Sequence, residues 1–152
     1  MLFRSRDFPS KAITLVVPYA AGGSSDTRAR QVAEKLASVL GKPVIVDNKP
    51  GGNGNIGTDF IARATPDGHT IGIGNFAPLA VNRHLYPKMT YNPLTDLVPV
   101  ILLERGPLVL VVNAEKSTHR SVRDLVAAAK ASPGRLSYAS AGSGGAFHLA
   151  GD

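Results

Sequence analysis

Two stretches of this sequence combine glycines, hydroxyl groups and a helix start in a pattern that could bind an anion. "PYAAGGSSD" (residues 18–26, the first glycine turn) and "ASAGSGG" (139–145, the last glycine turn) each follow an apolar run and precede residues with helical spacing. Free backbone N–H groups and the positive end of the helix dipole attract anions at such a junction. An ordinary capped loop is the alternative interpretation, and the first turn lacks the Gly-Lys-Ser/Thr ending of a P-loop.

A third glycine-rich stretch, "PGGNGNIGT" (50–58), contains a complete G-x-G-x-x-G at Gly52, Gly54 and Gly57. In dinucleotide-binding enzymes this motif directly follows a strand, and an acidic residue about 20 positions later binds the ribose. Here residues 49–51 separate the motif from the apolar run, and Asn75 stands where the acid belongs. We therefore expect these glycines to shape the start of a helix and to bind no nucleotide.

The last glycine turn also allows a second function, nucleophilic hydrolysis at Ser143. "AGSGG" approximates the G-x-S-x-G nucleophile elbow, with Ala141 in place of the first glycine. The only later histidine and aspartate are His148 and Asp152, which are too close along the chain to form a triad with Ser143. An α/β hydrolase remains the alternative if a further part of the protein supplies the partners.

Composition excludes several other classes of function. The chain has 152 residues with a net charge of +6, but its basic residues are scattered and only 6% of its residues are aromatic, which does not favour nucleic-acid binding. There is no cysteine and no spaced pair among the four histidines, so we expect neither a metal nor a cofactor. No window reaches the ~18 apolar residues of a membrane span, and the N-terminus shows no apolar signal-peptide region.

Strand-like and helix-like segments alternate around these turns. The first half predicts strands at 12–20, 43–48 and 69–75, helices at 27–40 and 55–65, and a short helix at 79–85. Ser25 or Asp26 is expected to cap the first helix and Gly41 to end it. The second half predicts strands at 97–104, 107–114 and 135–140, a helix at 121–130 with a capping box at Ser121, and a helix from Ala146. This order predicts an α/β fold with parallel sheets, and the last helix suggests a fragment of a longer protein.

Four stretches together resemble one known family. "ITLVVPYAAGGSSDTRARQVAEKL", "GKPVIVDNKPGGNGNIGTDFIARATPDGHTIGIGN", "LAVNRHLYPKMTYNPLTDLVPVILL" and "RLSYASAGSGGAFHLAGD" closely resemble the Bug receptors, the extracytoplasmic solute-binding proteins of tripartite tricarboxylate transporters. The resemblance runs from about residue 8 to 152. It implies a two-lobed periplasmic-binding-protein fold of type II-like architecture, here truncated. Lobe 1 would contain residues 8–103, a crossover 104–113, and the start of lobe 2 residues 114–152.

The resemblance also implies the function and the site. Such a receptor is not an enzyme; it closes on a small organic carboxylate, needs no cofactor, and passes the ligand transiently to membrane transporter subunits. The first and last glycine turns would face each other and hold the carboxylate, with Asn75 on the floor of the cleft. The ligand-binding residues carried over are Tyr19, Ala21, Gly23, Ser24, Ser25, Asn75, Ser140, Gly142, Ser143 and Gly144.

The sequence departs from this family in two ways. Its members are periplasmic and carry a signal peptide, which this sequence does not show, and they continue beyond residue 152. We therefore expect these 152 residues to be marginally stable and to bind a carboxylate weakly. The sequence does not indicate which carboxylate is bound.

Overall fold

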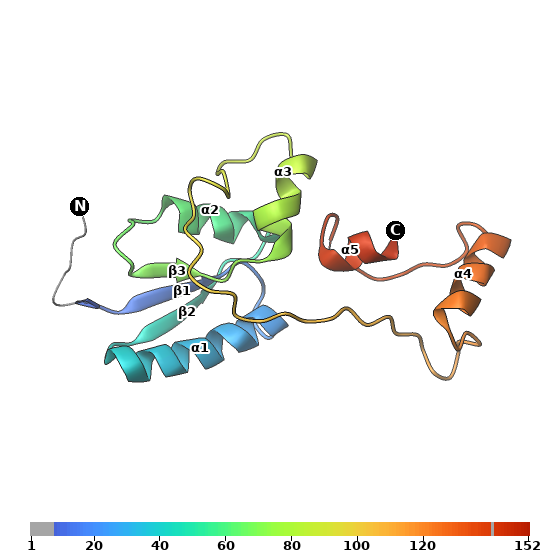
Figure 1. The fold of residues 1–152 in the computed structure, drawn as a ribbon, viewed down its shortest axis with the longest axis horizontal. Coiled ribbons are helices and arrows are strands. Elements are labelled where there is room, and N and C mark those ends of the chain that lie inside the picture. Colours follow the sequence, from blue (N-terminus) through green and yellow to red (C-terminus); the bar gives the residue numbers. More distant parts are fainter. Residues whose placement is uncertain (1–7, 141) are drawn as a thin grey trace.

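The computed structural model describes residues 8–140 and 142–152, and its centre is a sheet of three parallel strands (Figure 1). These are β1 (Ile13–Val17), β2 (Val44–Asn48) and β3 (Thr70–Gly72), in the order β2-β1-β3. In the register, Val17 pairs with Asn48, and Val16 pairs with Gly72. The predicted α/β class with a parallel sheet is confirmed, with each strand shorter than its apolar run.

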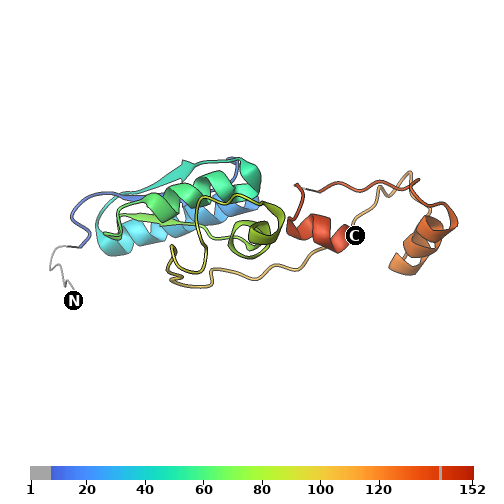
Figure 2. The same ribbon diagram turned by 90° about the horizontal axis from the view of Figure 1, so that it is seen from above.

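Two helices cover opposite faces of this sheet (Figures 1 and 2). α1 (Ser24–Leu40) packs Ala29 and Ala33 against Leu15 and Val17 of the central strand, and all four side chains are buried. α2 (Asn55–Arg63) lies on the face of Val16. Successive residues of a strand point to opposite faces, so β1, which is apolar except for Thr14, serves both helices.

α1 begins earlier than the periodicity predicts, and its cap differs. The N-cap residue is Gly23, whereas Ser25 and Asp26 lie inside the first turn of the helix. The carboxylate of Asp26 reaches back to accept a hydrogen bond from the amide of Gly22 at 2.8 Å. An acidic side chain at the third helical position can accept a hydrogen bond from a backbone amide just before the helix in this way. The cap position itself is occupied by Gly23, so the prediction that Ser25 or Asp26 occupies it is wrong. The predicted C-terminal residue, Gly41, is confirmed in the left-handed conformation (φ 65°).

Short helical segments complete the first half of the chain. A 3-10 turn η1 (Gly52–Gly54) leads into α2, and a π-helical turn η2 (Ala77–Val81) continues into α3 (Asn82–Leu85). The helix predicted at 79–85 is therefore confirmed and starts slightly earlier. These segments lie at the carboxyl ends of β2 and β3, on the edge of the sheet where the first glycine turn follows β1.

The strands predicted at 97–104, 107–114 and 135–140 are wrong for this structure. Within the described residues these runs are extended but have no hydrogen-bonded neighbour, and their side chains are exposed, Val98 by 87%. An apolar run forms a strand only when another strand pairs with its backbone groups. We call residues 8–103, which contain the sheet and its covering helices, the body. One ion pair, between Arg28 of α1 and Glu104, links the end of the run 97–104 to this body.

Beyond residue 96, the described residues form two helices. α4 (Val122–Ala131) has no buried residue, and α5 (Ala146–Gly151) lies between α4 and the sheet-containing body in both views (Figures 1 and 2). The helices predicted here are confirmed. The division into lobes around residues 104–113 stays a prediction.

Because α4 is exposed, its stability depends on its cap. The Ser121 hydroxyl accepts a hydrogen bond from the amide of Asp124 at 3.1 Å, as the capping box predicts. Ser121→Ala should destabilise the helix by about 1 kcal/mol. The measurement is the set of Cα chemical shifts of residues 122–131, which should move toward coil values. Ser132→Ala, just beyond the other end, is the control and should leave them unchanged.

Candidate functional site

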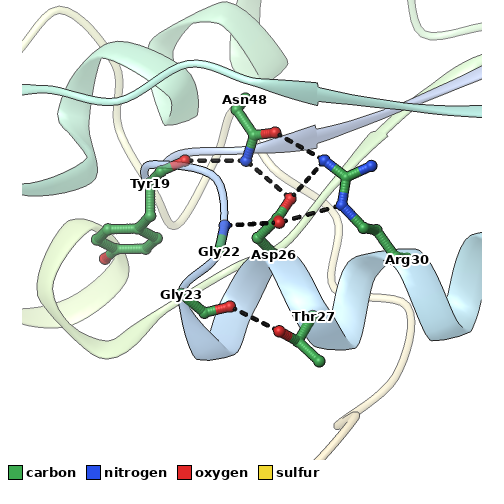
Figure 3. A network of polar contacts seen from close by, with 7 residues as sticks. All are labelled: Tyr19, Gly22, Gly23, Asp26, Thr27, Arg30 and Asn48. Carbon is green, nitrogen blue, oxygen red and sulfur yellow. Dashed lines mark hydrogen bonds and ion pairs between the residues drawn. The ribbon is translucent and has the colours of Figure 1, made fainter.

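The first glycine turn leaves the carboxyl end of β1 and is held there by Asp26 (Figure 3). One carboxylate oxygen accepts the amide of Gly22 at 2.8 Å, and the other accepts the side-chain amide of Asn48 at 3.0 Å. The same Asn48 nitrogen donates to the carbonyl of Tyr19 at 3.1 Å. Asn48 is placed for this because it ends β2 beside the last residue of β1. The turn is thus fixed at both of its ends.

Arg30 balances the charge of Asp26. Its Nε lies 3.1 Å from one carboxylate oxygen and its NH2 3.0 Å from the other, a two-point contact one helical turn along α1. Asp26 is only 3% exposed. The hydrogen bond from Arg30 and then that from Gly22 lower the pKa of the Asp26 carboxyl from 3.8 to about 2. Asp26 is therefore ionised at neutral pH, and its charge is already satisfied within the protein.

The amides at the start of α1 remain available. Those of Ser24, Ser25 and Asp26 have no hydrogen-bond partner among the described residues, while Thr27 donates to the carbonyl of Gly23. Ala21, Gly23 and Ser24 are exposed and Ser25 is half-buried. Unpaired N–H groups at the end of a 17-residue helix carry partial positive charge and favour an anion. This end of the helix can therefore donate hydrogen bonds to a carboxylate.

Tyr19 lies at the opposite side of the first turn from the carboxylate network (Figure 3). Its hydroxyl lies 3.0 Å from the position that a Cβ atom on Gly54 would occupy, so it packs on the middle glycine loop (residues 50–55). Burial, and then the neighbouring Tyr91, raise the pKa of the Tyr19 hydroxyl to about 12. The hydroxyl is therefore neutral and can donate a hydrogen bond.

The last glycine turn contacts the body at the same edge of the sheet. The carbonyl of Ser143 accepts a hydrogen bond from the side-chain amide of Asn53 at 2.8 Å. Gly144 is buried against Leu85 and Val81, whereas Gly142 and Ser140 are exposed. Ala141 lies outside the described residues. The first and last turns thus both border the middle glycine loop, through Tyr19 and Ser143 respectively.

The other predicted site residue, Asn75, follows β3 and is exposed. Its side-chain oxygen accepts a hydrogen bond from the amide of Phe76 at 2.7 Å, which begins the helical segment there. Its side-chain nitrogen has no hydrogen-bond partner among the described residues. Asn75 therefore lies at the same edge of the sheet as the first glycine turn, with its amide nitrogen free to donate among the described residues.

Two open hollows on the described surface lie away from all ten predicted residues. One of about 440 Å³ lies on the outer face of α2 and is lined by Lys49, Ile56, Asp59, Phe60, Arg63 and Ala64. The other, of about 290 Å³, lies between α1 and β2. The predicted cleft between the two turns coincides with neither, so the ligand-binding assignments remain predictions.

The sequence analysis missed the residues that hold the first turn in place. Asp26 and Arg30 are four residues apart on one helix, a spacing that indicates a side-chain ion pair. Asn48 ends a strand beside β1, and parallel strands bring such residues together. The spacing of Asp26 and Arg30 and the position of Asn48 at a strand end are both visible in the sequence. No sequence pattern indicated that Asn53 contacts Ser143.

Within the described residues, no cluster of three or more histidines, cysteines or acidic residues could bind a metal ion. No helix in that part of the chain is long and apolar enough to cross a membrane.

Residues 28–152 match the family described as the tripartite tricarboxylate transporter family receptor, TctC. The chain belongs to this family. The TctC match confirms the expected Bug-type resemblance, and a related curated protein is BugT of Bordetella pertussis, 41% identical over 93% of this chain. A protein encoded between tcbD and tcbE in Pseudomonas sp. strain P51 is 47% identical over 94% of it. This TctC chain spans 42–44% of the length of these two relatives.

Solved structures agree with the two-lobed periplasmic-binding-protein class. Rpa4515 of R. palustris with adipate superposes with a TM-score of 0.85 at 37% identity, over 91% of this chain and 46% of that one. MatC from Rhodopseudomonas palustris with bound malate has a TM-score of 0.60 at 40% identity, over 63% of this chain and 33% of that one. The family and these neighbours are solute-binding receptors, and a hydrolase finds no support among them.

Proposed function

We propose that this TctC chain is part of a periplasmic receptor that captures a small organic carboxylate for a tripartite transporter. The family match and the carboxylate ligands of two structural neighbours, adipate and malate, support a ligand of this class. The receptor would deliver its ligand to membrane subunits and would bind no nucleic acid. Residues that contact the rest of the ligand, apart from its carboxylate, would determine which carboxylate is bound.

The observation that carries this proposal is the set of unpaired amides at the start of α1. Ser24 and Ser25 combine a free N–H with a hydroxyl, and Gly23 brings no side chain that would cover them. Asp26 is neutralised by Arg30, so its charge does not repel an incoming carboxylate strongly. A carboxylate here would gain charge-assisted hydrogen bonds without a buried arginine of its own.

The remaining assignments place the ligand between this helix start and the last glycine turn. The proposed ligand-binding residues are Tyr19, Ala21, Gly23, Ser24, Ser25, Asn75, Ser140, Gly142, Ser143 and Gly144. Support comes from their common edge of the sheet and from the free donors of Tyr19 and Asn75. Gly144 is the weakest donor of the set, because its amide faces His148 Nδ1 at 3.4 Å.

The receptor would be non-catalytic. His148, the only histidine near Ser143 in the sequence, directs Nδ1 toward the amide of Gly144, and that atom lies 3.6 Å from the carboxylate of Asp152. Among the described residues the Ser143 hydroxyl has no hydrogen bond to a base. This arrangement offers no activated nucleophile.

The test is a titration of the ¹⁵N-labelled chain with adipate and with malate, followed by NMR, which detects millimolar binding. We expect amide shift changes concentrated at residues 21–25 and 140–145. The neutral diol of the same length as adipate is the control and should cause none. Equal changes with the diol, or changes confined to residues outside both turns, would contradict the proposal.

A further inference from the structure

The middle glycine loop, residues 50–55, projects one polar side chain out of an unusual backbone. Asn53 has a φ of 51° and lies between Gly52 (φ 57°) and Gly54 (φ 90°), and together with Gly51 (φ 121°) four successive residues have positive φ. Asparagine is among the few residues other than glycine that adopt this left-handed conformation readily. The G-x-G spacing thus presents the Asn53 side chain at the edge of the sheet.

Asn53 joins two parts of the chain that are far apart in sequence. Its side-chain Nδ2 donates to the carbonyl of Ser143 at 2.8 Å. Among the described residues this is the only hydrogen bond between residues 8–103 and residues 114–152. Its Oδ1 faces Gly142, where an added Cβ atom would lie 3.8 Å away. One side chain therefore contacts the last glycine turn at two consecutive residues.

A buried polar network fixes the orientation of Asn53. Asn82 is fully buried, and its Nδ2 donates to the Asn53 carbonyl at 3.1 Å and to the Asn55 side chain at 2.7 Å. The Tyr91 hydroxyl, which has one hydrogen to donate, lies 3.0 Å from the same Asn55 oxygen and 2.8 Å from the Pro78 carbonyl oxygen. Satisfied polar networks of this kind rigidify the segment that carries them. Asn53 is thereby preorganised for its contact with Ser143.

Apolar packing at Gly144 adds to the hydrogen bond between Asn53 and Ser143. Gly144 is buried against the side chain of Leu85, and an added Cβ atom would collide with it; Val81 lies 3.4 Å from the same position. The positive φ of Gly144 (77°) favours glycine where the last turn packs on η2 and α3. The turn is held by one polar and one apolar contact at adjacent residues.

We propose that Asn53 is the residue by which the body holds the last glycine turn against the sheet edge, a positioning residue for the ligand site. The inference rests on the proposed function for its effect on affinity, but the contact itself exists without ligand. The glycines around Asn53 then serve this contact and need not touch the ligand.

The experiment compares Asn53→Asp with wild type. Aspartate keeps the size of the side chain but replaces the donor to Ser143 with a carboxylate oxygen that repels the carbonyl. Since the chain has no cysteine, Ala150→Cys on the exposed side of α5 can carry a nitroxide label as the only thiol. In wild type the label should broaden the amide signals of residues 52–55 and 82–85. In Asn53→Asp most of this broadening should be lost.

The matched control is Asn113→Asp. The Asn113 side-chain oxygen accepts from the amides of Glu115 and Lys116, a role that aspartate retains. It should leave the broadening unchanged. Asn53→Gly, which tolerates the left-handed backbone, should reproduce the loss without adding charge. Unchanged broadening in both Asn53 variants, with wild-type melting temperature, would overturn the proposal.

Affinity separates this inference from the proposed function. With adipate as the probe, the loss of one hydrogen bond should weaken binding about fivefold in Asn53→Gly. If wild type binds no carboxylate while the label still reports the loss in Asn53→Asp, the proposed function fails and the contact stands. If wild type binds and both Asn53 variants keep full affinity and broadening, the contact fails and the proposed function stands.

Discussion

Gly57→Ala should destabilise the body by about 2–3 kcal/mol, because α2 packs on the backbone at that residue. A Cβ atom there would lie 2.7 Å from Pro18 Cα and 2.8 Å from the Lys49 carbonyl oxygen. Both atoms belong to the backbone, and Pro18 is fully buried, so neither can move without shifting β1 or β2. In a helix free of such contacts the same change should instead stabilise by about 1 kcal/mol. The sign of the effect therefore reports the packing.

Urea unfolding of both proteins, monitored by circular dichroism, measures this difference. Gly106→Ala is the matched control, since nothing lies within 4 Å of the added Cβ atom. It should leave the midpoint nearly unchanged. A Gly57→Ala protein as stable as wild type would mean that α2 does not approach the first glycine turn as closely as described.

Asp26→Asn should lower the melting temperature at neutral pH by about 10 °C, since one buried carboxylate holds three partners. The amide would point its NH₂ group at a donor, either Arg30 or Asn48, and the amide of Gly22 would lose a charged acceptor. The start of α1 would then be free to move. The amides of residues 23–25, which belong to the proposed site, should shift in the NMR spectrum as well.

The pH dependence gives this prediction a second readout. The folded-state pKa of Asp26, about 2, lies below its ordinary 3.8, so its contribution is fully present well above 3.8 and is lost as the pH falls toward 2. The difference in melting temperature between wild type and Asp26→Asn should therefore shrink as the pH is lowered from 5 to 2, as this linkage requires. Glu115→Gln, at an exposed carboxylate with no ion pair among the described residues, should show no such difference. A constant difference at every pH would contradict the assigned network.

The first half of the fold could be predicted because its signals are local. The run from Ile13 to Val17 is apolar except for Thr14 and β-branched except for Leu15, and α1 repeats its small residues with helical spacing, so both elements follow from the sequence pattern. The strands expected at 97–104 and 107–114 have the same apolar character but do not form in this structure. A strand is a property of a pair, and no described segment lies beside these runs to accept their hydrogen bonds.

The site shows the same division between local and long-range information. The helix start at Ser24 and Ser25, with its free amides, follows from a glycine-rich junction that any reader of the sequence can find. The contact of Asn53 with Ser143 spans 90 positions and depends on four positive φ angles in the middle glycine loop. Composition and spacing do not encode where such a side chain points, so only the structure supplied it.

The parallel direction of the three strands has a practical consequence for engineering. The first glycine turn and the middle glycine loop follow the carboxyl ends of β1 and β2, so the loops that precede the strands lie at the far end of the sheet. Gly41 and Lys42, which lead into β2, are exposed there, and a Cβ atom on Gly41 meets nothing within 4 Å. A fluorescent reporter or a peptide tag inserted at this junction would therefore be remote from the proposed carboxylate site, and a sensor could be built without altering that site.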